Sequence, residues 1–241
     1  MTPLVLVHGF MGGGAQWDAQ APLACCRDLI VVDLPGFGQN ADMAPIDSIS
    51  GYAAWVLAEL SRRGVHRFDL LGHSMGGMIV QDMVRQAPDR VHHLILYGTG
   101  PVGVLPGRFE TIETSMARAR NDGAEATARR IAATWFLRGA ADLAYAPCSD
   151  LAARAGLPAI LAGLEAMRNW SGEAHLPHIA SPTLVLWGDR DRTYAWPQIE
   201  TLWTGIADTE LAVVPGCAHA VHLESPGLFN RVLERYLTRT Q

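Results

Sequence analysis

Long hydrophobic runs are missing from this sequence, and so is a strong excess of one charge. No apolar segment approaches the roughly 20 residues of a transmembrane helix, and we expect no signal peptide before the first apolar run, Leu4–Val7. The formal net charge is only -5. We therefore expect a cytoplasmic protein with neither a membrane nor a nucleic acid as its partner. The basic residues that do gather are typical of a solvated helix face: Arg118, Arg120, Arg129 and Arg130.

Cysteine is also scarce. The four cysteines, Cys25, Cys26, Cys148 and Cys217, show no metal-ligand spacing. Cys25 and Cys26 are adjacent, which is a poor geometry for an ordinary structural disulfide. We interpret all four as reduced thiols, as expected in the cytoplasm.

Short apolar runs alternate with longer segments of helical period, which is typical of parallel strands joined by crossover helices. Most of the runs are apolar on both faces, as strands covered on two sides must be. The predicted strands are Leu4–Val7, Leu29–Val32, Phe68–Leu71, Leu94–Tyr97, Thr183–Trp187 and Leu211–Val214. The predicted helices are Gly51–Arg63, Met75–Gln86, Trp196–Ile206 and Pro226–Leu237. The pattern predicts an α/β fold with a mostly parallel sheet of about six strands flanked by helices.

Residues 99–179 interrupt this alternation. They contain no convincing strand, but helical periods occur at Phe109–Asn121, Ala124–Leu137 and Pro158–Asn169, separated by turn-forming residues such as Gly123 and Pro147. We predict that this segment is a helical lid inserted between two strands, over the sheet edge where open α/β sheets bind ligands. Residues 1–98 and 180–241 then form the core of a single structural domain.

The strongest chemical signal is Gly72-His73-Ser74-Met75-Gly76-Gly77. It follows a predicted strand and opens a predicted helix, which is the context that a nucleophile elbow requires. The glycines allow close backbone approach, and the helix amino end favours developing negative charge. A glycine-rich structural turn is the alternative interpretation. We favour Ser74 as a nucleophile.

A serine hydroxyl needs a base within hydrogen-bond reach. His219 follows the last predicted strand, so we expect it on a loop at the same sheet edge. His222 is the competing candidate, although its position beside Glu224 suggests that it faces the following helix. A zinc site built on these two histidines is not expected, because no third ligand is evident.

The base in turn needs a carboxylate that fixes its tautomer. Gly188-Asp189-Arg190-Asp191 follows the strand Thr183–Trp187. Asp189 directly follows the turn glycine and can serve the turn itself. We favour Asp191, which lies far enough beyond the end of the strand to reach the loop that carries His219.

The oxyanion of a tetrahedral intermediate requires backbone N–H donors. We expect one from Met75, directly after the nucleophile. The other is expected from the glycine-rich loop after the first strand, where Phe10 is the best placed donor and Met11 a weaker one. A merely flexible turn is the alternative interpretation of this loop.

Five blocks together resemble the signature of the α/β-hydrolase superfamily, in the order in which that family carries them. The blocks are His8-Gly9-Phe10, Asp33–Gly38, Gly72–Gly77, Gly188–Asp191 and Gly216–His219, and they span nearly the whole chain. The chain is most similar to small capped esterases and 3-oxoadipate enol-lactonases. His8-Gly9-Phe10 and Trp17 also resemble a menaquinone-pathway synthase that eliminates pyruvate. Such a fold hosts many chemistries, so the resemblance leaves the substrate open.

The resemblance fails at one point, because family members carry two antiparallel strands before the His-Gly block and here His8 lies near the start. We therefore expect either a six-strand sheet or a true start further upstream. The strand Leu29–Val32 would then be an exposed edge that can pair with a second subunit, so a monomer or a homodimer is expected.

The leading expectation is a serine hydrolase that cleaves a small carboxylic ester or lactone, with Ser74, Asp191 and His219 as its triad and no cofactor or metal. Hydrolysis of a C–C bond or pyruvate elimination by the same triad is the alternative, and a non-catalytic binding protein on the same fold is a third. The lid residues that could contact substrate are Met116, Trp135, Phe136, Met167 and Trp170, although such residues also form lid cores. An arginine that could hold a substrate carboxylate is Arg118, Arg129 or Arg168.

Overall fold

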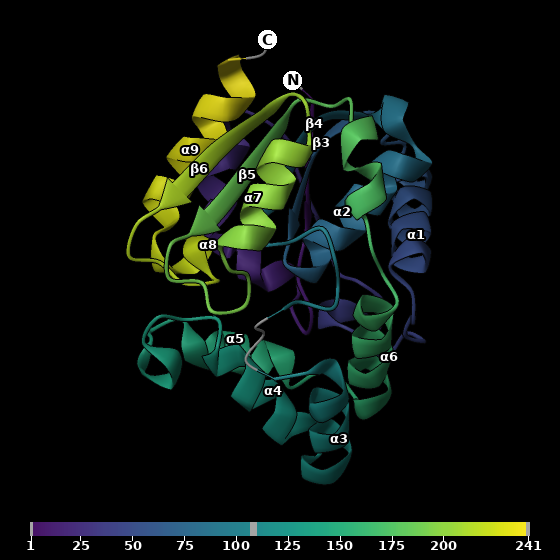
Figure 1. Ribbon diagram of the computed structural model, residues 1–241, viewed down its shortest axis with the longest axis vertical. Helices are drawn as coiled ribbons and strands as arrows, with labels where there is room; N and C mark the ends of the chain where they lie inside the picture. The colour runs from purple at the N-terminus through teal and green to yellow at the C-terminus, as the bar shows by residue number, and fades with distance from the viewer. Residues whose placement is uncertain (1, 107–109, 240–241) are drawn as a thin grey trace.

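The computed structural model describes residues 2–106 and 110–239, in which six strands form one parallel sheet in the order β2-β1-β3-β4-β5-β6 (Figure 1). The strands are β1 (Leu4–Val7), β2 (Leu29–Val32), β3 (Phe68–His73), β4 (Val91–Tyr97), β5 (Thr183–Gly188) and β6 (Thr209–Val214). The predicted fold class is confirmed. Four strands are longer than the predicted apolar runs, β3 and β5 at their ends and β4 and β6 at their starts, because main-chain pairing with a neighbouring strand continues into polar residues and glycines.

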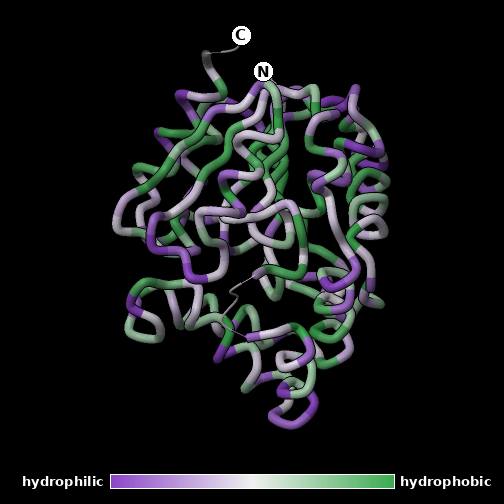
Figure 2. Tube along the Cα trace, viewed as in Figure 1, coloured by the Kyte–Doolittle hydropathy of each residue, from purple (hydrophilic) through white to green (hydrophobic). Residues whose placement is uncertain are grey.

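Helices cover both faces of the sheet (Figure 1), and the strands between them are largely hydrophobic (Figure 2), as burial on two sides requires. Within β1, Val5 and Val7 join the core under one set of helices, whereas Leu4 and Leu6 join a second core on the opposite face. The first set is α1 (Ile49–Arg62), α2 (Met75–Gln86) and α7 (Trp196–Gly205), and the second is the 3₁₀ segment η1 (Gly14–Cys25) with α9 (Pro226–Arg239).

The two ends of the sheet order are β2 and β6. The edge position predicted for Leu29–Val32 is therefore confirmed, and three of its four residues are only half-buried. No helix in residues 2–106 and 110–239 has both the length and the apolar character to span a bilayer.

Four helices lie between β4 and β5, beyond the carboxyl ends of the strands (Figure 1). They are α3 (Ile112–Asp122), α4 (Ala124–Ala133), α5 (Tyr145–Ala152) and α6 (Leu157–Arg168). We call this segment the helical insertion. Phe109, the predicted start of its first helix, lies outside the described residues.

The elements that were not predicted from the sequence include η1, α5 and the short α8 (Val221–Glu224). Pro147 suggested a break where α5 forms, but it lies in the first turn of that helix, where a backbone N–H has no intrahelical partner to lose. Helix α4 ends at Ala133, four residues before the predicted end, and Trp135 and Phe136 beyond it are buried in the core.

Candidate active site

Ser74 lies in a sharp turn between β3 and α2. Its φ of 58° and ψ of -121° place it in a region that L-residues rarely adopt, as expected for a nucleophile elbow. Two glycines make this turn possible, because a Cβ on Gly72 would collide with the carbonyl of Gly76, and a Cβ on Gly76 with that of Val7. Hydrogen bonds from Ser74 N to Tyr97 O (3.0 Å) and from Thr99 Oγ1 to Ser74 O (2.8 Å) hold the strained turn against the end of β4.

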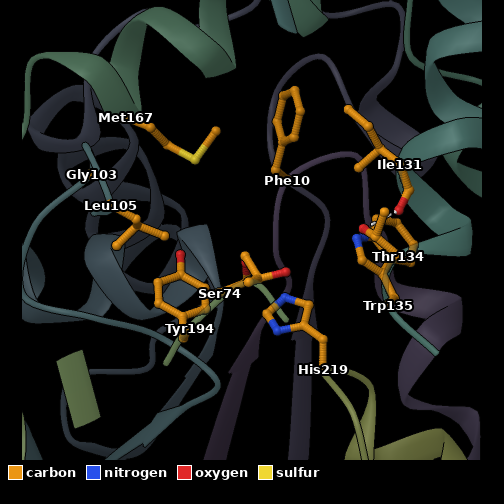
Figure 3. A pocket seen from close by; sticks show the side chains of 11 residues that line it. Phe10, Ser74, Gly103, Leu105, Ile131, Thr134, Trp135, Met167, Tyr194 and His219 are labelled. Atoms are coloured by element: carbon orange, nitrogen blue, oxygen red, sulfur yellow. Dashed lines mark hydrogen bonds between the residues drawn. The ribbon is translucent and has the colours of Figure 1, made fainter. Parts of the chain in front are cut away.

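The His219 ring lies directly beside the Ser74 side chain (Figure 3). Its Nδ1 is 2.8 Å from Asp191 Oδ2, and both side chains are almost completely buried, with 2% and 1% exposed. Asp191 Oδ1 accepts hydrogen bonds from the backbone N–H groups of Thr193 (2.7 Å) and Tyr194 (3.2 Å). Because Asp191 engages Nδ1, the free ring nitrogen for a proton from Ser74 is Nε2.

The two competing residues of the sequence analysis have other partners. Asp189 Oδ1 accepts a hydrogen bond from Gly216 N at 2.6 Å and so connects the loops after β5 and β6. His222 is buried behind the site, where its Nδ1 lies 2.9 Å from the Tyr97 hydroxyl and its ring packs on Trp17. Of the two acids and the two histidines, only Asp191 and His219 meet at the pocket.

A buried polar network holds the backbone of His219. Its carbonyl oxygen accepts hydrogen bonds from the Tyr97 hydroxyl (2.9 Å) and from His73 Nε2 (3.1 Å), and the His73 ring stacks on Tyr97. Burial, reinforced by the nearby charge of His219, lowers the pKa of His222 to about 3 and the pKa of His73 well below 6.5. His73 and His222 are therefore neutral at pH 7 and can stand beside a His219 that becomes charged.

The glycine-rich loop after β1 packs against Ser74. A Cβ on Gly9 would lie 2.9 Å from Ser74 Cβ, so Gly9 allows this approach. His8 fixes the loop, because its Nε2 accepts from Leu34 N (3.0 Å) and its Nδ1 is therefore the donor to Gly9 O (2.8 Å). Burial lowers the pKa of His8, in keeping with this neutral tautomer. The two residues expected to donate to an oxyanion lie on either side of Ser74. Phe10 follows Gly9 and borders the pocket that contains Ser74, and Met75 begins α2 directly after Ser74.

A pocket that is open to solvent on one side lies above Ser74. Its walls come from the core and from the helical insertion, as Figure 3 shows. The apolar lining side chains are Phe10, Leu105, Ile131, Trp135 and Met167, and the polar ones include Thr134, Thr193 and Tyr194. The space therefore suits a small, mainly apolar group bonded to the atom that Ser74 would attack.

The helical insertion is fastened to the loop that carries His219. Ala220 N donates to Trp135 O (2.9 Å), and Glu224 accepts from both Leu137 N (2.7 Å) and Ala218 N (2.6 Å). Burial raises the pKa of Glu224. Hydrogen bonds thus connect the insertion to residues on the loop of His219, directly through Ala220 and through Glu224 to Ala218.

Of the candidate substrate contacts in the insertion, Trp135 and Met167 line the cavity. Met116 and Phe136 are core residues, and Trp170 packs against that core from a half-buried position. The three candidate arginines pair with acids away from the cavity: Arg118 with Glu110, Arg129 with Glu125 and Asp150, and Arg168 with Glu165. Helical spacing selects the apolar face of a helix, but not which part of that face borders a cavity.

The sequence matches known proteins over nearly its whole length. A family model described as "Alpha/beta hydrolase family" matches residues 4–232. The chain belongs to the alpha/beta hydrolase family. This α/β hydrolase is 28% identical over 240 residues to "Putative carbamate hydrolase RutD" of Rhizobium rhizogenes, covering 97% of this chain and 92% of that protein.

A second relative of this α/β hydrolase, from Pseudomonas sp, is named 2-hydroxy-6-oxononadienedioate/2-hydroxy-6-oxononatrienedioate hydrolase. It is 26% identical over 259 residues, covering 98% of this chain and 88% of that protein. The solved structure of an enol-lactonase from Burkholderia xenovorans LB400 matches with a TM-score of 0.89 at 22% identity, covering 98% of this chain and 91% of that one. That likeness shows the fold. Together with the family match, the relatives identify the chain as a hydrolase of the α/β fold.

Several residues around the site were not singled out from the sequence. Tyr97 and Tyr194 are the main examples, since Tyr97 binds the His219 carbonyl and Tyr194 stacks on the His219 ring at 5.7 Å. Their positions in the sequence could have identified them. Tyr97 ends a strand at the carboxyl edge of the sheet, and Tyr194 follows Asp191 by three residues. His73 was part of the elbow block, but only the structure gives it a hydrogen-bond partner.

Proposed function

We propose that this α/β hydrolase cleaves a small carboxylic ester or lactone through an acyl-enzyme on Ser74. The observation that carries the proposal is a strained serine beside a histidine whose Nδ1 is 2.8 Å from a buried carboxylate. A serine hydroxyl becomes a useful nucleophile only with a base in this relation, and a carboxylate on Nδ1 leaves Nε2 to accept the proton.

In the proposed reaction, Ser74 Oγ attacks the carbonyl carbon while His219 Nε2 takes the hydroxyl proton. The N–H groups of Met75 and Phe10 stabilise the oxyanion, and each donor contributes roughly a hundred- to a thousandfold in rate. Asp191 stabilises the imidazolium that forms. His219 then gives its proton to the leaving alkoxide, and a water molecule, deprotonated by His219, releases the acyl group as an acid.

The apolar cavity supports a small and mainly hydrocarbon acyl group, since Phe10, Trp135 and Met167 border it. A carbamate differs from an ester only in the atom attached to the carbonyl, so the same steps would hydrolyse one. The relative named a carbamate hydrolase makes this a substrate class worth including in the test.

The test is turnover of p-nitrophenyl esters from acetate to octanoate, and of a p-nitrophenyl carbamate, by the native protein and its Ser74→Ala variant. We expect the native protein to prefer short acyl chains and the variant to lose at least a thousandfold in kcat. Equal turnover by both proteins would refute Ser74 as the nucleophile.

A second candidate reaction is hydrolysis of a C–C bond by the same triad, which is favoured by the 26% identical relative named as a hydrolase of 2-hydroxy-6-oxo dioic acids. Activity on a vinylogous diketone with none on simple esters would select it. Activity on an enol-pyruvate adduct would instead select elimination, and tight binding of a small molecule without any turnover would select a binding protein.

A further inference from the structure

A second cluster of chemically competent side chains lies at the amino end of the sheet, remote from Ser74. Asp69 of β3 faces both His92 and His93 of β4. Phe68 pairs with Val91 but Leu70 pairs with Leu94, so one residue of β3 stands opposite two residues of β4. Such a bulge redirects side chains, and here it allows two consecutive imidazoles to reach one carboxylate.

The three side chains converge on a single point. His93 Nδ1 lies 2.7 Å and His92 Nδ1 3.1 Å from the same oxygen, Asp69 Oδ1, and all three atoms lie within 4.8 Å of one another. In a tetrahedral Zn²⁺ site with bonds of about 2.0–2.2 Å, ligand atoms are about 3.3 Å apart. To admit an ion, His93 Nδ1 and Asp69 Oδ1 would therefore have to separate from 2.7 Å to about 3.3 Å, which side-chain rotation can supply.

We propose that Asp69, His92 and His93 form a binding site for a divalent transition-metal ion, with Zn²⁺ as the best match. Two imidazoles and one carboxylate favour Zn²⁺ and its neighbours in the first transition row over Mg²⁺ or Ca²⁺, which prefer oxygen ligands. Both histidines then carry their single proton on Nε2 and bind through Nδ1. Water supplies the fourth ligand.

The surroundings of Asp69 resemble the outer shell of a metal site. Arg27 Nη1 lies 2.6 Å from Asp69 Oδ2, the oxygen that the histidines do not use, and both side chains are buried. A carboxylate that binds a metal through one oxygen is commonly oriented by a hydrogen bond to the other. The His93 ring also packs edge-on against Tyr236 of α9 at 5.7 Å.

The cluster has an entrance on the side of His92, whose side chain is 31% exposed, whereas Asp69 and His93 are almost completely buried. Asp69 precedes Ser74 by five residues of strand and turn, which corresponds to about 16 Å. The ion would therefore link β3 to β4 beside the ion pair of Asp69 with Arg27, and stabilise the fold without taking part in catalysis.

The experiment uses the full chain, treated with EDTA and then dialysed. Co²⁺ is added as a probe, because tetrahedral Co²⁺ gives an intense visible spectrum, and Zn²⁺ binding is followed by the unfolding temperature. We expect one equivalent of metal to bind. At free Zn²⁺ a hundred times the dissociation constant, we expect the unfolding temperature to rise by about 5–10 °C.

The decisive variant is His92→Gln, which removes the exposed ligand and leaves the ion pair of Asp69 with Arg27 intact. We expect it to bind at least tenfold more weakly, whereas His66→Gln, which changes an exposed histidine elsewhere, binds like the native protein. Ester turnover by His92→Gln reports that the variant is folded.

Two other groups of the chain could bind the probe. The adjacent thiols of Cys25 and Cys26 have their sulfur atoms 3.1 Å apart, and Asp191 with His219 offers another pair. We expect the double variant Cys25→Ser/Cys26→Ser and the single variant Asp191→Asn to retain the equivalent that His92→Gln loses. Absence of binding to the native protein, or equal binding by His92→Gln, would overturn the proposal. Either result leaves Ser74-dependent hydrolysis untouched.

Discussion

Replacing Asp191 by Asn tests the proposed triad through a single proton. Asp191 Oδ1 accepts two backbone hydrogen bonds, from Thr193 N at 2.7 Å and Tyr194 N at 3.2 Å. In the variant the amide oxygen must take this position, because an NH₂ group there would face two donors. The amide NH₂ group then occupies the place of Oδ2 and points at His219 Nδ1.

The consequence is a change of tautomer. His219 Nδ1 becomes an acceptor, so the proton of the neutral ring moves to Nε2. Nε2 is the atom that must be unprotonated to accept the proton of Ser74, so the ring can no longer act as the base. Enforcing this tautomer lowers kcat about 10⁴-fold in a Ser-His-Asp triad. That factor corresponds to about 5.4 kcal/mol of transition-state stabilisation.

The assay is initial-rate turnover of the best p-nitrophenyl ester, with circular dichroism to verify folding. Asp189→Asn is the matched control, because Asp189 lies two residues away and accepts a single backbone hydrogen bond, from Gly216. We expect that variant to retain kcat within about tenfold. A kcat for Asp191→Asn within tenfold of the native value, or an equal loss in both variants, would refute the reasoning.

Three further predictions follow from the buried network and the cavity. Tyr97→Phe removes the hydroxyl that binds the His219 carbonyl and His222, so the free energy of unfolding measured in urea should fall by about 1–3 kcal/mol. The control Tyr145→Phe removes an exposed hydroxyl and should cost less. Equal stabilities of the two variants would contradict the prediction. Because His222 has a folded pKa of about 3 against an unfolded value near 6.5, only the unfolded chain gains its proton as the pH falls from 6.5 toward 3. The free energy of unfolding should therefore decline by about 1.4 kcal/mol per pH unit for this group, and the profile of His222→Gln should be shallower by that slope; parallel profiles would disprove the assignment. Trp135→Ala enlarges the cavity and should lengthen the preferred acyl chain by two or more carbons. Trp203→Ala changes a surface residue and should leave the preferred chain length unchanged. The same chain-length profile in both variants would exclude Trp135 from the acyl pocket.

The sequence predicted the order of strands and helices well, because apolar runs and helical periods are local properties. Met75–Gln86 and Leu4–Val7 agree with the structure residue by residue. The position of Ser74 between a strand and a helix was predicted for the same reason, since Gly72 and Gly76 lie within two residues of it. Segments without a clear period, such as η1, were missed.

The chain order also narrowed the choice of acid and base. Asp191 and His219 were favoured because loops after parallel strands gather at one edge of the sheet, and the structure brings these two side chains into contact. Their catalytic roles stay predictions that Asp191→Asn and Ser74→Ala test.

What only the tertiary structure decided is which side chains meet when they come from distant segments. Tyr97 and His73 reach the carbonyl of His219 across more than 100 residues of chain, and Arg129 turns to surface acids instead of the cavity. The meeting of Asp69 with two histidines depends on the pairing of β3 with β4 and on a one-residue bulge between them. Strand register and the packing of helices on a sheet are set by the sum of many weak contacts, so no local pattern in the sequence contains them.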